Sequence, residues 1–140
     1  MRIILLLAFC FSVVALKSQD NSKTVTKAIN DAQKKVEMGD YYGALKVCSE
    51  VYSQDSLNPE LNFFMGVSNY YLGQIDVSEK HLLKAKSNVS LELFRYKALV
   101  AHRKMKFKKA MNYFNAYKLI LGDKEVTNEE INRLIGKTKY

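Results

Sequence analysis

The sequence predicts an all-α fold built from repeated helical hairpins. Only one of the 140 residues is proline, so long helices meet few interruptions. The six glycines are too few for a turn-dense β-sandwich. The third observation is an internal repeat, which is typical of stacked hairpins. A chain of this length is expected to form one domain.

The repeat occurs three times, with offsets of 34 and then 32 residues, in segments 37–45, 71–79 and 103–111. Small residues recur at two positions of this register: Ala32, Gly66 and Ala98 at the first, and Ala44, Ser78 and Ala110 at the second. We expect the two helices of a hairpin to approach closely there. Glycine ends the first helix in two copies, but Met105 replaces it in the third. Because glycine adopts the left-handed conformation most easily, a strained or lengthened turn is expected at Met105.

A period near 34 with this alternation resembles the tetratricopeptide repeat (TPR). The resemblance covers about residues 24–140 and implies a right-handed solenoid of three helix-turn-helix repeats, about 25–58, 59–90 and 91–122. A C-terminal capping helix at about 127–138 would close it. The position that is tryptophan-like in the family holds Ala28, Asn62 and Phe94, so the first two copies depart from the pattern.

We expect seven helices, at about 23–38, 41–54, 59–72, 77–86, 91–104, 107–121 and 128–137. Pro59 suits a first helical turn, where its missing N–H costs nothing. Ser90 is the predicted N-cap of the fifth helix. Thr127 and Glu130 form a predicted capping box before the last helix.

Residues 1–18 have the pattern of a secretory signal peptide, with Arg2 followed by a mostly apolar stretch over residues 3–16. That stretch is short for a permanent membrane span, although an uncleaved anchor and a buried helix are alternatives. Cleavage before Gln19 would leave a TPR-like domain, 19–140, exported to the bacterial periplasm, either free there or associated with the outer membrane. Cys48 would then be its single cysteine, without an intramolecular disulfide.

No catalytic constellation is found, so we expect neither enzymatic activity nor a cofactor or small-molecule substrate. His81 and His102 have no cysteine or carboxylate at ligand spacing, which argues against a metal site. Cys48 falls at a repeat core position, where a small buried hydrophobe is expected.

In TPR proteins the first helix of each pair lines the concave face. By position, this resemblance assigns Ile29, Gln33 and Val36 to that face. It also yields the candidate partner-binding groove, which consists of Phe63, Val67, Tyr70, Tyr71, Arg95, Leu99, His102 and Arg103. Aromatic and arginine residues are the usual anchors of interfaces. The alternative is that Phe63 and Tyr70 simply pack between hairpins.

Chaperone-binding TPRs grip a C-terminal carboxylate with basic and asparagine side chains. The corresponding positions here hold Ile29, Gln33, Phe64, Glu92 and Tyr96, none of which is basic. That mode of binding is therefore not expected.

The charge is concentrated in residues 91–121, which contain eight basic residues and one acidic residue. Lys104, Lys106, Lys108 and Lys109 form the predicted basic face. An acidic protein partner, peripheral contact with an envelope or membrane surface, and a merely solvated face are the alternatives. Export argues against nucleic acid.

These observations favour an exported TPR scaffold that mediates protein–protein interaction in the bacterial cell envelope and binds a partner segment in the groove of repeats 2 and 3. The alternative is a structural or assembly subunit of an outer-membrane-associated, secretion-type complex. More narrowly, the chain is similar to the N-terminal TPR module of exported envelope proteins that continue into propeller and OmpA-like domains.

Overall fold

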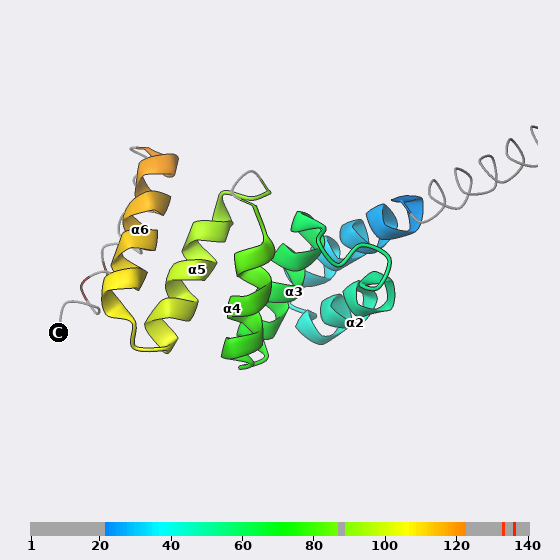
Figure 1. Ribbon diagram of the computed structural model, residues 1–140, viewed down its shortest axis with the longest axis horizontal. Coiled ribbons are helices and arrows are strands. Elements are labelled where there is room, and N and C mark those ends of the chain that lie inside the picture. The colour runs from blue at the N-terminus through cyan, green and yellow to red at the C-terminus, as the bar shows by residue number, and fades with distance from the viewer. Residues whose placement is uncertain (1–21, 87–88, 123–132, 134–135, 137–140) are drawn as a thin grey trace, which may run out of the picture.

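The computed structural model describes residues 22–86, 89–122, 133 and 136, and this part of the chain contains helices and no strand. A helix over residues 22–37 is followed by α2 (Tyr41–Val51), α3 (Pro59–Tyr71), α4 (Ile75–Lys84), α5 (Glu92–Arg103) and α6 (Phe107–Leu121). The helices succeed one another along the long axis of the molecule, from residues 22–37 on the right of Figure 1 to α6 on the left. The predicted all-α class is confirmed.

Consecutive helices pack as hairpins. The helix over residues 22–37 shares a buried cluster with α2, while α3 pairs with α4 and α5 with α6. Residues 38–40, 72–74 and 104–106 are the three turns within the hairpins. In addition, α3 contacts α5, so first helices of successive hairpins are neighbours and share one face of the molecule. That face carries the groove described below.

The small residues of the repeat lie at the helix contacts, as the register predicts. Ala44, Ser78 and Ala110 are fully buried. The Ser78 hydroxyl donates to the carbonyl oxygen of Gly66 at 2.7 Å, which joins α4 to α3. A Cβ atom added at Gly66 would lie 2.6 Å from Cγ of Leu82, so a larger residue there requires a shift of the helices.

The three turns share one backbone geometry. Gly39 and Gly73 have φ angles of 78° and 77°, and Met105 has 56°. The amide of Lys106 donates to Ala101 at 2.9 Å, in the same relative positions as the bonds that close the other two turns. The expected strain at Met105 is therefore present, whereas the alternative of a lengthened turn is wrong, because the side chain is accommodated in the left-handed region without an added residue.

Two helices differ from the expected bounds by two or more residues at an end. α2 ends at Val51, three residues early, because the amide of Gln54 turns back to the Val51 carbonyl. α4 begins at Ile75 rather than 77 and ends at Lys84, where Ala85 adopts an extended conformation.

Polar side chains contribute to the starts of α3 and α5. Pro59 occupies the first turn of α3, as predicted, and Asn58 is its N-cap. The Ser90 hydroxyl accepts from the amide of Glu92 at 3.1 Å, although the N-cap residue itself is Leu91. Residues 1–18 and the capping box at 127–130 lie outside the described residues. Of the expected capping helix, Arg133 and Gly136 are described, both in helical conformation.

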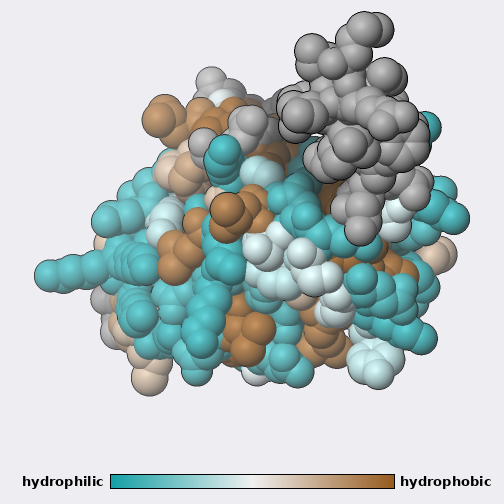
Figure 2. Space-filling model, turned by 45° about the vertical axis from the view of Figure 1, so that its right-hand side comes forward, coloured by the Kyte–Doolittle hydropathy of each residue, from teal (hydrophilic) through white to brown (hydrophobic). Residues whose placement is uncertain are grey.

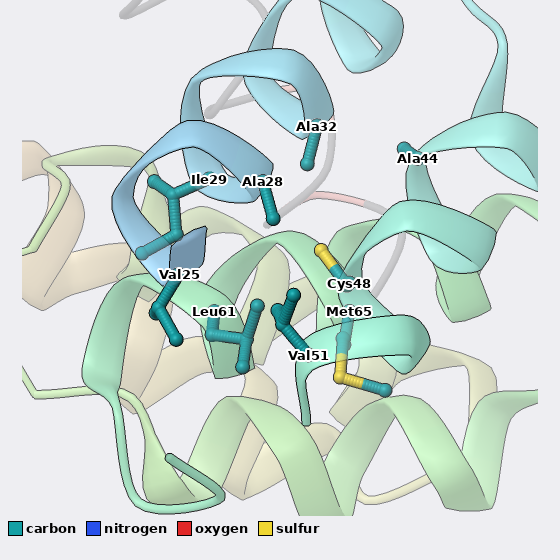
Figure 3. Packing of buried hydrophobic residues seen from close by; sticks show 9 residues of the cluster. All are labelled: Val25, Ala28, Ile29, Ala32, Ala44, Cys48, Val51, Leu61 and Met65. Carbon is teal, nitrogen blue, oxygen red and sulfur yellow. The ribbon is translucent and has the colours of Figure 1, made fainter. Parts of the chain in front are cut away.

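The apolar core is divided into three clusters along the solenoid. Figure 3 shows the first, in which side chains from residues 22–37, α2 and α3 point toward one another. The second centres on Val67, Leu82 and Leu93 of α3, α4 and α5. The third centres on Phe114 and Tyr117 and joins α5 to α6. Each cluster lies where neighbouring hairpin elements meet, as expected for a repeat protein.

Asn62 occupies the position that is tryptophan-like in TPR proteins, and it acts as a buried polar clamp. Its amide nitrogen donates to the carbonyl oxygens of Ser56 at 3.0 Å and Asn58 at 2.8 Å. Its side-chain oxygen lies 2.9 Å from Nδ1 of His81, which must carry the proton. Burial, reinforced by the charge of Lys84, lowers the pKa of His81 and favours this neutral form. The clamp holds the loop before α3 against α4.

Candidate binding groove

A groove of about 390 Å³ lies between the helix over residues 22–37, α3 and the start of α5. Its walls combine apolar and polar side chains. Thirteen of the described residues line it: Ile29, Asn30, Gln33, Val36, Glu37, Glu60, Phe63, Phe64, Val67, Val89, Ser90, Glu92 and Tyr96. Ile29, Gln33 and Val36 lie here as the register predicts. The groove therefore extends across repeat 1, beyond the predicted repeats 2 and 3.

An aromatic cluster links this groove to the C-terminal end of α3. The ring of Tyr96 lies 6.1 Å, centroid to centroid, from each of Phe63, Tyr70 and Tyr71. Tyr71 in turn stacks on Tyr41 of α2 at 4.0 Å with an interplanar angle of 9°. Because the cluster joins rings from α2, α3 and α5, it fixes the relative positions of three helices and forms a preorganised apolar surface.

The predicted groove residues of α3 divide into floor and rim. Phe63 is nearly buried and Val67 fully buried, so they form the floor beneath the groove rather than surface offered to a partner. Tyr70 is half-buried and Tyr71 is 44% exposed. Burial raises the pKa of Tyr70, while the charges of Arg103 and Arg95 oppose that rise, which places both cations in its electrostatic neighbourhood.

The other four predicted groove residues, Arg95, Leu99, His102 and Arg103, lie on α5. Arg103 is exposed. Leu99 packs against the second and third core clusters, and the ring of His102 lies 5.7 Å from that of Phe107. Arg95 donates from Nη1 to Glu92 at 3.1 Å and lies over the ring of Tyr96 at 5.5 Å from its centroid. Among the eight predicted residues, Phe63 and Val67 line the groove, whereas the other six do not.

Three carboxylates also line the groove, and the search for aromatic and arginine anchors missed two of them. The Glu92 carboxylate accepts from Arg95 and from the Tyr117 hydroxyl, so its charge is matched by a neighbouring cation. Glu37 accepts a hydrogen bond from the neutral amide of Gln33 at 2.9 Å. In the part of the chain that the structure describes, neither Glu37 nor Glu60 forms an ion pair. Both positions face the groove in the repeat register, which is the signal that could have identified them.

The predicted basic face is largely tied to carboxylates of α4. Lys104 donates to Asp76 at 2.6 Å and to Glu79 at 2.5 Å. Lys106 and Lys109 each lie 3.5 Å from Oε1 of Glu79. These cations, Lys104 above all, lower the pKa of Glu79. Lys108 is exposed and forms no ion pair with another described residue. Most of this positive charge therefore joins repeat 3 to repeat 2.

Other chemistry-bearing groups are structural. Burial raises the pKa of Cys48 to about 12, so its thiol stays protonated and unreactive at neutral pH.

Within residues 22–86 and 89–122, no three His, Cys, Asp or Glu side chains are grouped so that they could hold a metal ion. None of the helices described is long and apolar enough to cross a membrane.

The exposed surface is mixed. On the face seen in Figure 2, apolar side chains lie in small groups between polar ones.

Comparison with solved structures supports the architecture. The TPR2B domain of yeast Sti1, in a complex with pHsp70, matches with a TM-score of 0.64 at 16% identity, covering 83% of this chain and 96% of that one. The type III secretion translocator chaperone SycD of Yersinia enterocolitica matches with a TM-score of 0.64 at 17% identity, covering 84% and 85%. SycD in complex with a peptide of the translocator YopD matches with the same TM-score at 15% identity, covering 84% and 93%.

No family model matches the chain, and no curated protein matches it. At these identities the structural likeness establishes the fold alone. Together with the three hairpins and the shared face of their first helices, it shows that the chain has a TPR-like fold.

Proposed function

We propose that the chain is an exported, non-enzymatic scaffold of the bacterial cell envelope that binds a segment of a partner protein along its concave face. The segment would cross the groove and reach the exposed part of Tyr71 and the guanidinium of Arg103, where it would present acidic residues. The signal-like residues 1–18 motivate the location in the periplasm.

The observation that supports this proposal most strongly is the aromatic cluster that lies between the groove and the two arginines, Arg95 and Arg103. Tyr96 lines the groove and contacts Tyr70, whose electrostatic neighbours are Arg103 and Arg95. Rigid aromatic rings beside arginines are typical of interface anchors. Protein binding as a class is also supported by the structural neighbours, since the Sti1 domain was solved with pHsp70 and SycD with a peptide of YopD.

The test begins with capture of partners from a cell-envelope fraction by residues 19–140, followed by titration calorimetry with the purified partner. Replacing a residue that anchors the partner lowers the binding free energy by about 2 kcal/mol or more, which is a loss of roughly 30-fold in affinity. We expect such a loss for Tyr70→Ala and for Arg103→Ala. Tyr42→Ala and Lys46→Ala are the matched controls, because both residues are exposed on α2 and neither lines the groove.

Circular dichroism must show that each variant remains folded. If both groove variants bind like the parent while reversal of Lys108 abolishes binding, the partner sits on the basic face and the groove proposal is refuted. In that case a polyanionic surface becomes the better candidate.

A further inference from the structure

The groove and its C-terminal extension carry opposite charge. Glu37 and Glu60 line the groove without an ion pair among the described residues, and the third lining carboxylate, Glu92, is matched by Arg95. Among the residues that the structure describes, no lysine or arginine lines the groove. Arg103 is exposed at the C-terminal end of α5, the helix that contacts α3 and carries Tyr96. The concave face is therefore negative over repeats 1 and 2 and positive toward repeat 3.

The floor between these two regions is apolar. Phe63, Phe64 and Val67 line the groove, and Phe63 lies 5.3 Å from Phe64 and 6.1 Å from Tyr96 between ring centroids. A volume of about 390 Å³ accommodates one or two large side chains of a peptide. The polar groups at its edge would then contact the residues that flank those side chains.

From this arrangement we infer that the groove selects a charge-segregated segment, in which large apolar side chains are flanked by lysine or arginine at one end and by acidic residues at the other. The basic end contacts Glu37 and Glu60, the apolar centre covers Phe64 and Tyr96, and the acidic end reaches Arg103. This inference rests on the proposed function and specifies its partner. It adds a basic end to the segment of the proposed function and so defines the order of its charges.

The contribution of these charges to the affinity for a segment can be calculated, and it is small. Exposed ion pairs contribute about 0.2–1 kcal/mol each. Removing both unpaired carboxylates should therefore weaken binding of a lysine-bearing segment by about two- to thirtyfold. The effect should decrease with added salt, because the screening length falls from roughly 8 Å at 0.15 M to about 3 Å at 1 M ionic strength.

Three labelled peptides with the same Leu-Phe-Leu centre can test the inference by fluorescence anisotropy on residues 19–140. One has two lysines at one end and two aspartates at the other, the second has lysines at both ends, and the third has aspartates at both ends. The double variant Glu37→Gln/Glu60→Gln keeps the side-chain shape and removes the charge. Glu50→Gln is the matched control, since Glu50 is exposed on α2 and does not line the groove.

We expect the charge-segregated peptide to bind most tightly. The double variant should bind both lysine-bearing peptides about two- to thirtyfold more weakly and the aspartate peptide no more weakly, while Glu50→Gln binds like the parent. Arg103→Ala should weaken the binding of the two aspartate-bearing peptides and leave the binding of the third peptide unchanged.

Parent-like binding of the lysine-bearing peptides by the double variant overturns the inference. If the aspartate peptide binds most tightly and depends on Arg103, the proposed function stands and only this inference fails. If none of the three peptides binds, the groove function and the inference fail together.

Discussion

Met105 is the one described residue other than glycine with a positive φ angle, and replacing it with glycine should stabilise the protein. The left-handed conformation costs an L-residue about 1–2 kcal/mol. Glycine avoids this cost but gives the unfolded chain additional conformational freedom, which offsets about 0.4–1 kcal/mol. Because the Met105 side chain is 75% exposed, its removal sacrifices little burial. We therefore expect Met105→Gly to raise the free energy of unfolding by about 0.5–1 kcal/mol.

Urea unfolding followed by circular dichroism measures this difference, and the melting temperature should rise by about 2–6 °C. Met38→Gly is the matched control: Met38 is 74% exposed in the equivalent turn and has no positive φ, so glycine there should destabilise. The reciprocal change Gly39→Ala should cost about 0.5–1 kcal/mol, and it isolates the backbone effect because an added Cβ atom meets nothing within 4 Å. If Met105→Gly destabilises as much as Met38→Gly, the strain argument is refuted.

Three further predictions follow from the packing, the charges and the N-terminus. Ala110→Leu should destabilise by about 1–3 kcal/mol through overpacking of a fully buried helix contact, and a parent-like melting curve would contradict this. The pKa of Glu79 is lowered from 4.5, so its stabilising contribution is complete at neutral pH and is lost as the pH falls from about 4.5 through the folded-state value. Glu79→Gln should accordingly destabilise at neutral pH and flatten the acid side of the stability–pH curve, as measured by urea unfolding across pH. Intact mass of the exported protein should begin at Gln19, and a mass that includes residues 1–18 would exclude cleavage.

The repeat register predicted the hairpins because it records a steric requirement. Small residues such as Ala44 and Ala110 recur where two helices approach, and the structure buries both completely. The end of α2 was less accessible to prediction, because it depends on how the Gln54 amide turns back to Val51. No residue type in the sequence forces that hydrogen bond.

The candidate site was predicted in outline only. Register positions placed Phe63 and Val67 at the groove, but their depth beneath its surface follows from the packing of α5 on α3. Glu37 and Glu60 occupy the same concave register and were overlooked because aromatic and arginine residues received all the weight. The charge of residues 91–121 was counted along the chain, whereas Lys104 is paired in space with Asp76 of the preceding hairpin.

The division of the core into three clusters has a consequence for how the molecule opens. Each cluster joins only neighbouring elements, so α6 can detach while the cluster around Cys48 stays closed. Amide hydrogen exchange should therefore be graded along the chain rather than uniform, with slowest exchange in α3, which contributes to the first two clusters. A ligand lying across the groove would couple these separate openings and make the solenoid unfold more nearly as one cooperative unit.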